Sequence, residues 1–195
     1  MTAMQEHFLE TLQPMIESGK LFCFLAQFPA QFKCTKENVA YLEVLRDLFP
    51  KLPVAVELRD YSWYGKEFAE KTKQLMKTLN FSLVIVDEPQ LPDTVPLDAT
   101  VTNKNFSLFR FHGRNQAYWN DRTGDWRKKR TLYRYNEAEL TLLGEEIKQA
   151  AKHSADVGVI FNNNSGGDAA DNALQLKKIL QLNYEGLNPS QIDLF

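Results

Sequence analysis

Five short apolar segments alternate along the chain with longer segments in which apolar residues recur every three or four positions. The short segments predict strands at 20–28, 54–59, 81–88, 106–114 and 156–163. The longer segments predict helices at about 4–18, 36–49, 66–79, 136–152 and 168–182, the fourth opening with a capping box of Asn136 and Glu139. Strands that alternate with helices pair in parallel through crossover connections, so the pattern indicates an α/β fold.

The segment at 106–114, with the sequence FSLFRFHGR, divides packing from chemistry between its two faces. Side chains alternate across a strand, so the phenylalanines at 109 and 111 lie on one face, whereas Arg110, His112 and Arg114 share the other. The polar residues gather at the carboxyl end, where parallel strands of α/β proteins present functional side chains. Polar carboxyl ends suit a (β/α) barrel and an open doubly wound sheet equally.

The carboxyl ends of the predicted strands bring polar residues to one edge of the sheet. These residues are Gln27, Glu57, Arg59, Asp87, Arg110, His112 and Asn163. We predict Glu57, His112 and Asp87 as catalytic residues, because carboxylates and imidazole perform acid–base catalysis or bind a divalent metal. Glu88, at the same strand end as Asp87, is the alternative to it. The residues come from separate strands, so no compact ligand motif identifies a metal.

Three arginines at these strand ends, Arg59, Arg110 and Arg114, are predicted to bind a phosphate or carboxylate. The guanidinium group is a planar fork that matches the oxygens of such anions. The alternative is that Glu57 pairs with Arg59 or Arg110 and that the group only balances buried charge.

Two glycines before the last helix, Gly166 and Gly167, are predicted to offer backbone amides to the same anion. Gln27 and Asn163 complete the predicted binding set. The alternative is an ordinary tight turn with Asp168 at the helix N-terminus, where its carboxylate would compete with an anion.

The segment at 113–135 is long for a connection within a compact domain and is therefore a candidate lid. Seven basic residues against two acidic ones give it a charge of +5, and two tryptophans and three tyrosines lie among them. Aromatic rings among cations suit a nucleotide or single-stranded nucleic acid, through stacking and phosphate contacts. A lid whose aromatic side chains pack on the rim of the domain is the alternative.

The composition is that of a globular protein with one sizeable core, since 44% of the 195 residues are hydrophobic and 25% are charged. The net charge of −2 provides no overall attraction to nucleic acid or an anionic membrane, so attraction must come from a local patch. Two cysteines without a paired motif fit a reducing compartment. No apolar run approaches the roughly 18 residues of a membrane span, and we predict a cytoplasmic protein.

Several motifs together resemble one family. They are QFPAQF at 27–32, VAVELRDYSW at 54–63, FRFHGR at 109–114, YRYNEAEL at 133–140 and VIFNNNSGGDAADNALQL at 159–176. In this order they resemble the bacterial family of domain of unknown function 72, also called YecE-like, and the likeness extends over essentially the whole chain. The resemblance implies a TIM-type (β/α) barrel whose biochemical activity is not established.

The resemblance also implies that the chain corresponds to part of the family's barrel. Family members carry about three further strand–helix units before the QFP strand, so this chain resembles about five of the eight units, barrel strands four to eight. The expected organisation is a single domain at 1–185, an apparently incomplete barrel with 113–135 as its lid. A truncated reading frame, a fragment and half of a split protein remain open as explanations.

The last five residues, QIDLF at 191–195, resemble the pentapeptide that binds the bacterial DNA sliding clamp. In such a peptide Leu194 and Phe195 fill an apolar pocket while Gln191 forms a hydrogen bond beside it. Residues 186–190 would serve as a tether. The alternative is that Leu194 and Phe195 dock on their own domain.

These features lead to one functional hypothesis and two alternatives. The leading hypothesis is an enzyme that acts on a phosphate-bearing substrate, related to nucleotides or nucleic acid, and is tethered to the sliding clamp. The alternatives are a non-enzymatic binding module associated with the clamp and an inactive remnant of a longer barrel. Neither the substrate nor a cofactor follows from the sequence, although a divalent metal is compatible with the predicted residues.

Overall fold

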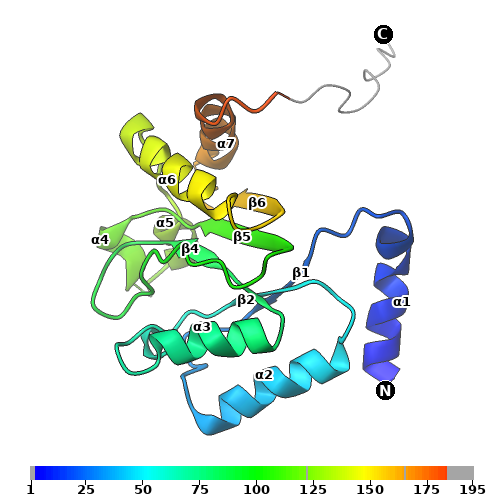
Figure 1. Cartoon of the computed structure of the whole chain (residues 1–195). Coiled ribbons are helices and arrows are strands. Elements are labelled where there is room, and N and C mark those ends of the chain that lie inside the picture. Colours follow the sequence, from blue (N-terminus) through cyan, green and yellow to red (C-terminus); the bar gives the residue numbers. More distant parts are fainter. Residues whose placement is uncertain (1–2, 122, 165, 184–195) are drawn as a thin grey trace.

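The structure, a computed structural model, describes residues 3–121, 123–164 and 166–183 (Figure 1). Its strands are β1 (Phe24–Gln27), β2 (Val54–Glu57), β3 (Ser82–Leu83), β4 (Ile85–Asp87), β5 (Phe106–Phe111) and β6 (Asp156–Phe161). Its helices are α1 (Ala3–Glu17), α2 (Lys36–Leu48), the 3-10 helix η1 (Tyr61–Trp63), α3 (Ala69–Thr78), α4 (Gln116–Trp119), α5 (Trp126–Arg130), α6 (Glu137–Ala150) and α7 (Asp168–Ile179). None of the helices in the described ranges combines the length and apolar character needed to cross a membrane.

The strands form two parallel sheets of three strands each, ordered β1-β2-β3 and β4-β5-β6. The segment predicted as a single strand at 81–88 supplies both β3 and β4, because the pairing partner changes at Val84. β3 pairs with β2, whereas β4 pairs with β5. The Val84 amide donates to the carbonyl oxygen of Val56 at 2.9 Å, so the two sheets meet at this residue.

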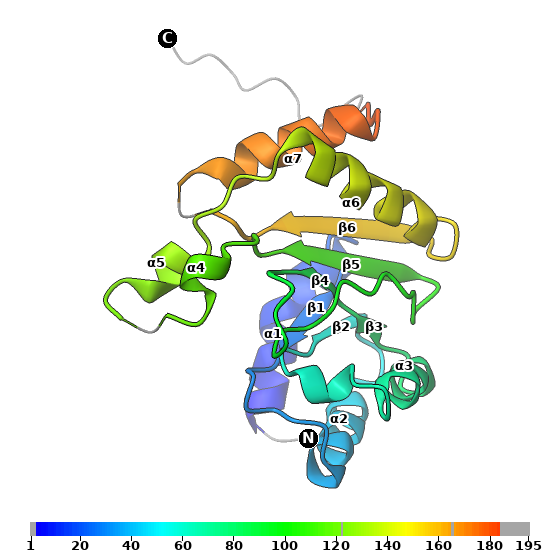
Figure 2. The same ribbon diagram turned by 90° about the vertical axis from the view of Figure 1, so that its left-hand side faces the viewer.

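The predicted TIM-type barrel is wrong. Within the described residues the strands remain two three-stranded sheets that do not close into a barrel (Figure 2). The outer strands β1 and β6 pair with β2 and β5 respectively. A barrel closes only if the number, tilt and stagger of its strands are mutually consistent. The alternation of strands and helices in the sequence determines none of these three quantities. The α/β class and the parallel pairing predicted from that alternation are present.

Each sheet has a helix-covered face with its own core. In the first sheet Val54 packs with Leu42 of α2 and Met76 of α3, and all three side chains are completely buried. In the second sheet Phe109 and Phe111 pack against α6 and α7. Figures 1 and 2 show the two helix pairs on opposite sides of the molecule, with the strands between them.

The opposite faces of the two sheets share a third core. Ala55 of β2 and Leu108 of β5 belong to it, and both are nearly or completely buried. Because side chains alternate along a strand, Glu57 and Arg110 follow two positions later on the same faces. The third core therefore ends in charged side chains at the carboxyl ends of the strands.

The predicted lid leaves the end of β5 and contains the short helices α4 and α5 (Figure 2). The other end of the lid leads directly into α6, and the capping box predicted at the start of α6 is confirmed. Asn136 Oδ1 accepts from the Glu139 amide, and Glu139 Oε2 accepts from the Asn136 amide, both at 2.9 Å. Both ends of the lid are thus anchored on regular elements.

Candidate functional site

A cavity of about 710 Å³ lies between the carboxyl ends of the strands and the lid. Its walls come from the segments that follow five strands and from α4 and α5. The lining residues are Gln27, Pro29, Ala30, Gln31, Arg59, Glu88, Asp93, Thr94, His112, Trp119, Asn120, Trp126, Arg130, Thr131 and Asn162. Ligands of α/β proteins bind outside the carboxyl ends of the strands, so this cavity is the candidate site.

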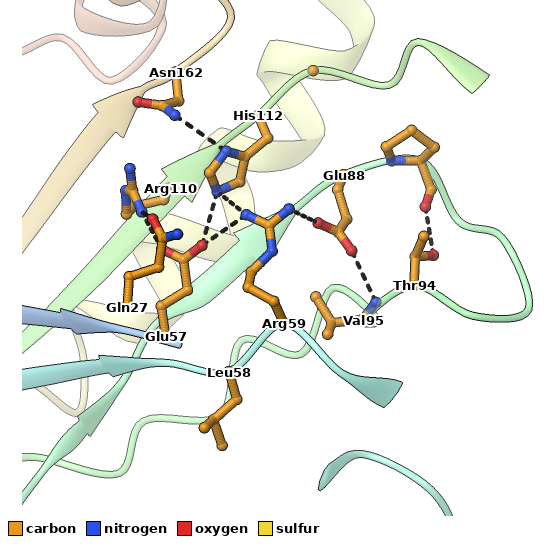
Figure 3. A network of polar contacts seen from close by, with 12 residues as sticks. Gln27, Glu57, Leu58, Arg59, Glu88, Thr94, Val95, Arg110, His112 and Asn162 are labelled. Carbon is orange, nitrogen blue, oxygen red and sulfur yellow. Dashed lines mark hydrogen bonds and ion pairs between the residues drawn. The ribbon is translucent and has the colours of Figure 1, made fainter. Parts of the chain in front are cut away.

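Glu57 is completely buried behind the cavity wall and is the centre of a network of polar contacts (Figure 3). Arg59 Nη1 lies 2.8 Å from Glu57 Oε1 and 2.8 Å from His112 Nε2. His112 Nε2 is 3.1 Å from the same carboxylate oxygen, and Arg110 forms a close ion pair with the other one. Arg110 Nη1 also donates to Gln27 Oε1 at 2.9 Å. The tertiary structure thus brings together five of the predicted residues.

The surroundings of Glu57 favour its ionised form, and those of His112 favour the neutral ring. Burial alone would raise the pKa of Glu57, but the hydrogen bond to His112 and the charges around the carboxylate outweigh it and lower the pKa to about 2. Burial lowers the pKa of His112 to about 4, against the opposing effect of Glu57. At neutral pH the imidazole is therefore uncharged, and Arg59 and Arg110 balance the carboxylate.

Glu88, the alternative to Asp87, lines the cavity and lies on the other side of Arg59 (Figure 3). Its Oε2 is 2.6 Å from Arg59 Nη2, and its Oε1 accepts from the Val95 amide at 3.0 Å. Burial raises the pKa of Glu88, and the charge of Arg59 opposes this only in part. One arginine therefore joins two buried glutamates whose pKa values are shifted in opposite directions.

Asp87 and Arg114 do not line the cavity and form a second cluster with each other. Arg114 Nη2 lies 2.7 Å from Asp87 Oδ1, and the Tyr135 hydroxyl donates to Asp87 Oδ2 at 2.6 Å. The same hydroxyl accepts from the Gly113 amide at 2.9 Å. Gly113 starts the lid and Tyr135 ends it, so this cluster joins the two ends of the lid.

Asn163 and the predicted anion-binding glycines also lie away from the cavity lining. Asn163 is completely buried, and its Nδ2 donates to the Tyr133 carbonyl and to the Asn172 side chain. Gly167 has a φ of +80° and forms the turn before α7. Asn162, the residue directly after β6, lines the cavity instead of Asn163. Its Nδ2 lies 3.3 Å from His112 Nδ1.

The lid contributes aromatic rings and a cation to the cavity. The guanidinium carbon of Arg130 lies 3.8 Å from the ring centroid of Trp119, and that of Arg59 lies 5.8 Å from it. Trp126 lines the same cavity, whereas Tyr118 is exposed and lies near Lys129. Trp119 itself is only 4% exposed, so part of the lid packs on the rim, as the alternative interpretation of its aromatic residues predicted.

The donor set around Glu57 does not fit a divalent metal. No group of three or more His, Cys, Asp or Glu side chains within the described ranges could hold a metal ion. Both carboxylate oxygens of Glu57 already face guanidinium groups, and Arg59 also approaches His112 Nε2. A cation there would have to displace two arginines that balance the same charge.

The fold and the cavity define an α/β protein that presents a charged pocket at the carboxyl ends of its strands. The chain belongs to the family described as "Protein of unknown function DUF72", which matches residues 1–193. The family predicted from the five motifs is thereby confirmed.

This chain spans about two thirds of the length of the following relatives. The UPF0759 protein YunF of Bacillus subtilis (strain 168) is 43% identical over 98% of this chain and 69% of its own length. A crystal structure of a DUF72 family protein from Enterococcus faecalis V583 has 56% identity and a TM-score of 0.92, covering 97% of this chain and 70% of that one. A DUF72 family protein from Thermotoga maritima MSB8 has 39% identity and a TM-score of 0.82, covering 91% and 65%.

The clamp-binding-like tail, with Gln191, Leu194 and Phe195, lies outside the described residues. Its role stays a prediction.

Proposed function

We propose that this protein is an enzyme that acts by acid–base chemistry on a phosphate-bearing substrate in the cavity at the strand ends. The observation that carries the proposal is the position of Arg59. Its guanidinium contacts the Glu57–His112 pair, faces Glu88 and lies over Trp119 in one cavity. Positive charge, titratable groups and an aromatic ring therefore converge where a ligand would enter.

The cations and aromatic rings that line the cavity support this substrate class. Arg59 and Arg130 supply two guanidinium groups, which bind phosphate oxygens through charge-assisted hydrogen bonds. Trp126 supplies aromatic surface on which a base can stack, while the buried Trp119 ring lies against the Arg130 guanidinium. This combination favours a nucleotide or a nucleic-acid end over a simple inorganic anion.

The acid–base role falls to His112, with Glu57 as its positioning residue. The ring is neutral at pH 7 because burial lowers its pKa, so it can accept a proton from a reacting group. The carboxylate of Glu57, 3.1 Å from Nε2, stabilises the imidazolium that forms. Arg110 holds the carboxylate from behind, and Gln27 accepts a hydrogen bond from Arg110, so neither needs to contact the substrate.

Nucleotide binding tests the proposal, with tryptophan fluorescence as the signal, because two of the three tryptophans line the cavity. Nucleoside monophosphates and a short single-stranded oligothymidylate serve as probes. Arg130→Ala should weaken binding by about 10- to 100-fold, since a hydrogen bond to a charged group contributes roughly 1.5–3 kcal/mol. Lys128→Ala is the matched control, because Lys128 belongs to α5 but does not line the cavity and is largely exposed.

Turnover is tested with the nucleoside monophosphates by measuring released phosphate. His112→Asn should abolish release while the thermal transition and the Arg130-dependent binding persist. Absence of binding by every probe, or equal binding by the Arg130→Ala and unmodified proteins, would contradict the substrate class. Unchanged release by His112→Asn would contradict the acid–base role.

The tail supports a second proposal, which concerns a partner. We infer from QIDLF at 191–195 that the protein binds the bacterial DNA sliding clamp. Replacing Leu194 and Phe195 together with alanine should remove binding in a pull-down with purified clamp, while Ile192→Ala has a smaller effect. Clamp binding that survives the double replacement would reject this partner, and the nucleotide titrations above would then decide the function alone.

A further inference from the structure

Glu88 is a buried carboxylate with one oxygen that lacks a hydrogen-bond donor. The residue is 2% exposed, and Oε1 accepts from the Val95 amide at 3.0 Å. Oε2 has no hydrogen-bond partner among the described residues. Arg59 Nη2 lies 2.6 Å away and pairs with Oε2 by charge, but its direction does not form a hydrogen bond. Buried polar atoms are normally satisfied, so this oxygen is a candidate contact for a ligand or a proton.

The ionised form of Glu88 is stabilised mainly by Arg59, a group that Glu88 shares with Glu57. Glu57 faces both Arg59 and Arg110, whereas Arg59 is the one ion-pair partner of Glu88 among the described residues. Arg130 in the lid also favours the ionised form of Glu88, and the charge of Glu57 disfavours it.

Two further titratable groups lie near Glu88. Tyr64 is a phenol whose pKa is raised by burial, so it is uncharged in the neutral range. Asp93 is exposed at the rim of the cavity and adds negative charge there. If another anion bound Arg59, Glu88 would lose its counter-charge, and neither Tyr64 nor Asp93 could replace it.

We propose that Glu88 takes up a proton when an oxyanion binds Arg59, and that its Oε2 then donates a hydrogen bond to that anion. A dianion at Arg59 would leave an ionised Glu88 buried beside a second negative charge, which is costly in a low-dielectric site. Protonation removes the repulsion and turns the unsatisfied oxygen into a donor. The inference rests on the proposed anion site. It narrows the ligand to tetrahedral oxyanions that have one oxygen free to accept a hydrogen bond from Glu88.

Sulfate is the probe, because it keeps both charges between about pH 5 and pH 8, whereas phosphate itself titrates in that range. Affinity is read from tryptophan fluorescence. Binding that takes up one proton should weaken about tenfold per pH unit above the pKa of Glu88 in the free protein, and should level off below that pKa. The isosteric change Glu88→Gln should make sulfate affinity independent of pH.

The remaining outcomes separate this inference from the proposed function. No sulfate binding at any pH would overturn the anion site itself and this inference with it. Sulfate binding without pH dependence, or with the same dependence in Glu88→Gln, would overturn only the role of Glu88. If the pH dependence of sulfate binding is lost in His112→Asn and kept in Glu88→Gln, the proton belongs to His112. That result would also overturn the role of Glu88.

Calorimetry of the unmodified protein provides an independent measurement in case Glu88→Gln does not fold. Sulfate titrations at neutral pH in two buffers of different ionisation enthalpy should give an uptake of about one proton per bound sulfate. An uptake of zero would overturn the proposal without any variant.

Discussion

Replacing Glu57 with alanine is expected to lower the free energy of unfolding by roughly 3–5 kcal/mol, a large share of the stability of a typical domain. The change removes the carboxylate that faces Arg59 and Arg110, so the buried Arg110 loses its counter-charge and Arg59 keeps its pair with Glu88. His112 also loses a hydrogen-bond partner. Urea denaturation followed by circular dichroism measures the effect.

The matched control is Glu70→Ala, because Glu70 also pairs with a basic side chain but is largely exposed. That pair is screened by water, and its loss should leave the denaturation midpoint essentially unchanged. Similar midpoints for the Glu57→Ala and unmodified proteins would mean that the network does not stabilise the fold.

The contribution of Glu57 also has a defined pH dependence. Its pKa falls from an ordinary value of 4.5 to about 2 in the folded protein, so the folded state favours the ionised carboxylate. The stabilisation is present above the ordinary value and is lost as the pH falls toward 2. The Glu57→Ala protein should lose less stability than the unmodified protein across that window.

Replacing Gly113 with alanine is expected to cost roughly 2–4 kcal/mol, from backbone strain and from overlap with the end of the lid. Gly113 has a φ of +85°, and a Cβ atom there would lie 2.6 Å from Tyr133 Cβ. Tyr133 cannot move away freely, because its carbonyl oxygen accepts from buried Asn163. A thermal melt and the near-ultraviolet circular dichroism of the cavity tryptophans measure the loss of stability and the displacement of the lid.

Gly124→Ala is the control for the backbone alone. Gly124 also has a positive φ, +53°, but a Cβ atom there would meet no atom of the described residues within 4 Å. We expect a smaller loss, about 1 kcal/mol, with no change in the near-ultraviolet signal. Equal losses at the two positions would show that the contact between the ends of the lid is unimportant.

Two of the predicted site residues that the structure brings together lie in or directly after β5, a strand with unlike faces. In β5 the alternation of phenylalanines with Arg110 shows which face is polar, and His112 continues that face. The segment at 81–88 is apolar on both faces, so its pattern could not decide whether Asp87 or Glu88 lines the cavity. Packing decides it, since Ile85 joins the core beneath α6 and α7 while Val86 joins the core between the sheets.

Arg114 illustrates a second limit of reasoning from alternation. It has the same parity as Arg110 and His112, yet it lies with Asp87 on the other side. The left-handed backbone at Gly113 redirects the chain after the strand ends, so the alternation of faces no longer holds. The limit found at 81–88 also applies at the end of β6, where Asn162 lines the cavity in place of the predicted Asn163. β6 carries apolar residues on both faces, so its pattern does not show which of the two asparagines faces the cavity.

The sequence by itself determined the order of strands and helices, their parallel pairing, the capping box of α6 and the gathering of charge at the strand ends. These features depend on local periodicity and on residues close together in the chain. Only the tertiary structure decided the change of partner at Val84, the two separate sheets and the placement of Glu88, Trp119 and Arg130 around Arg59. Those outcomes depend on contacts between segments far apart in the chain, which local patterns leave undetermined.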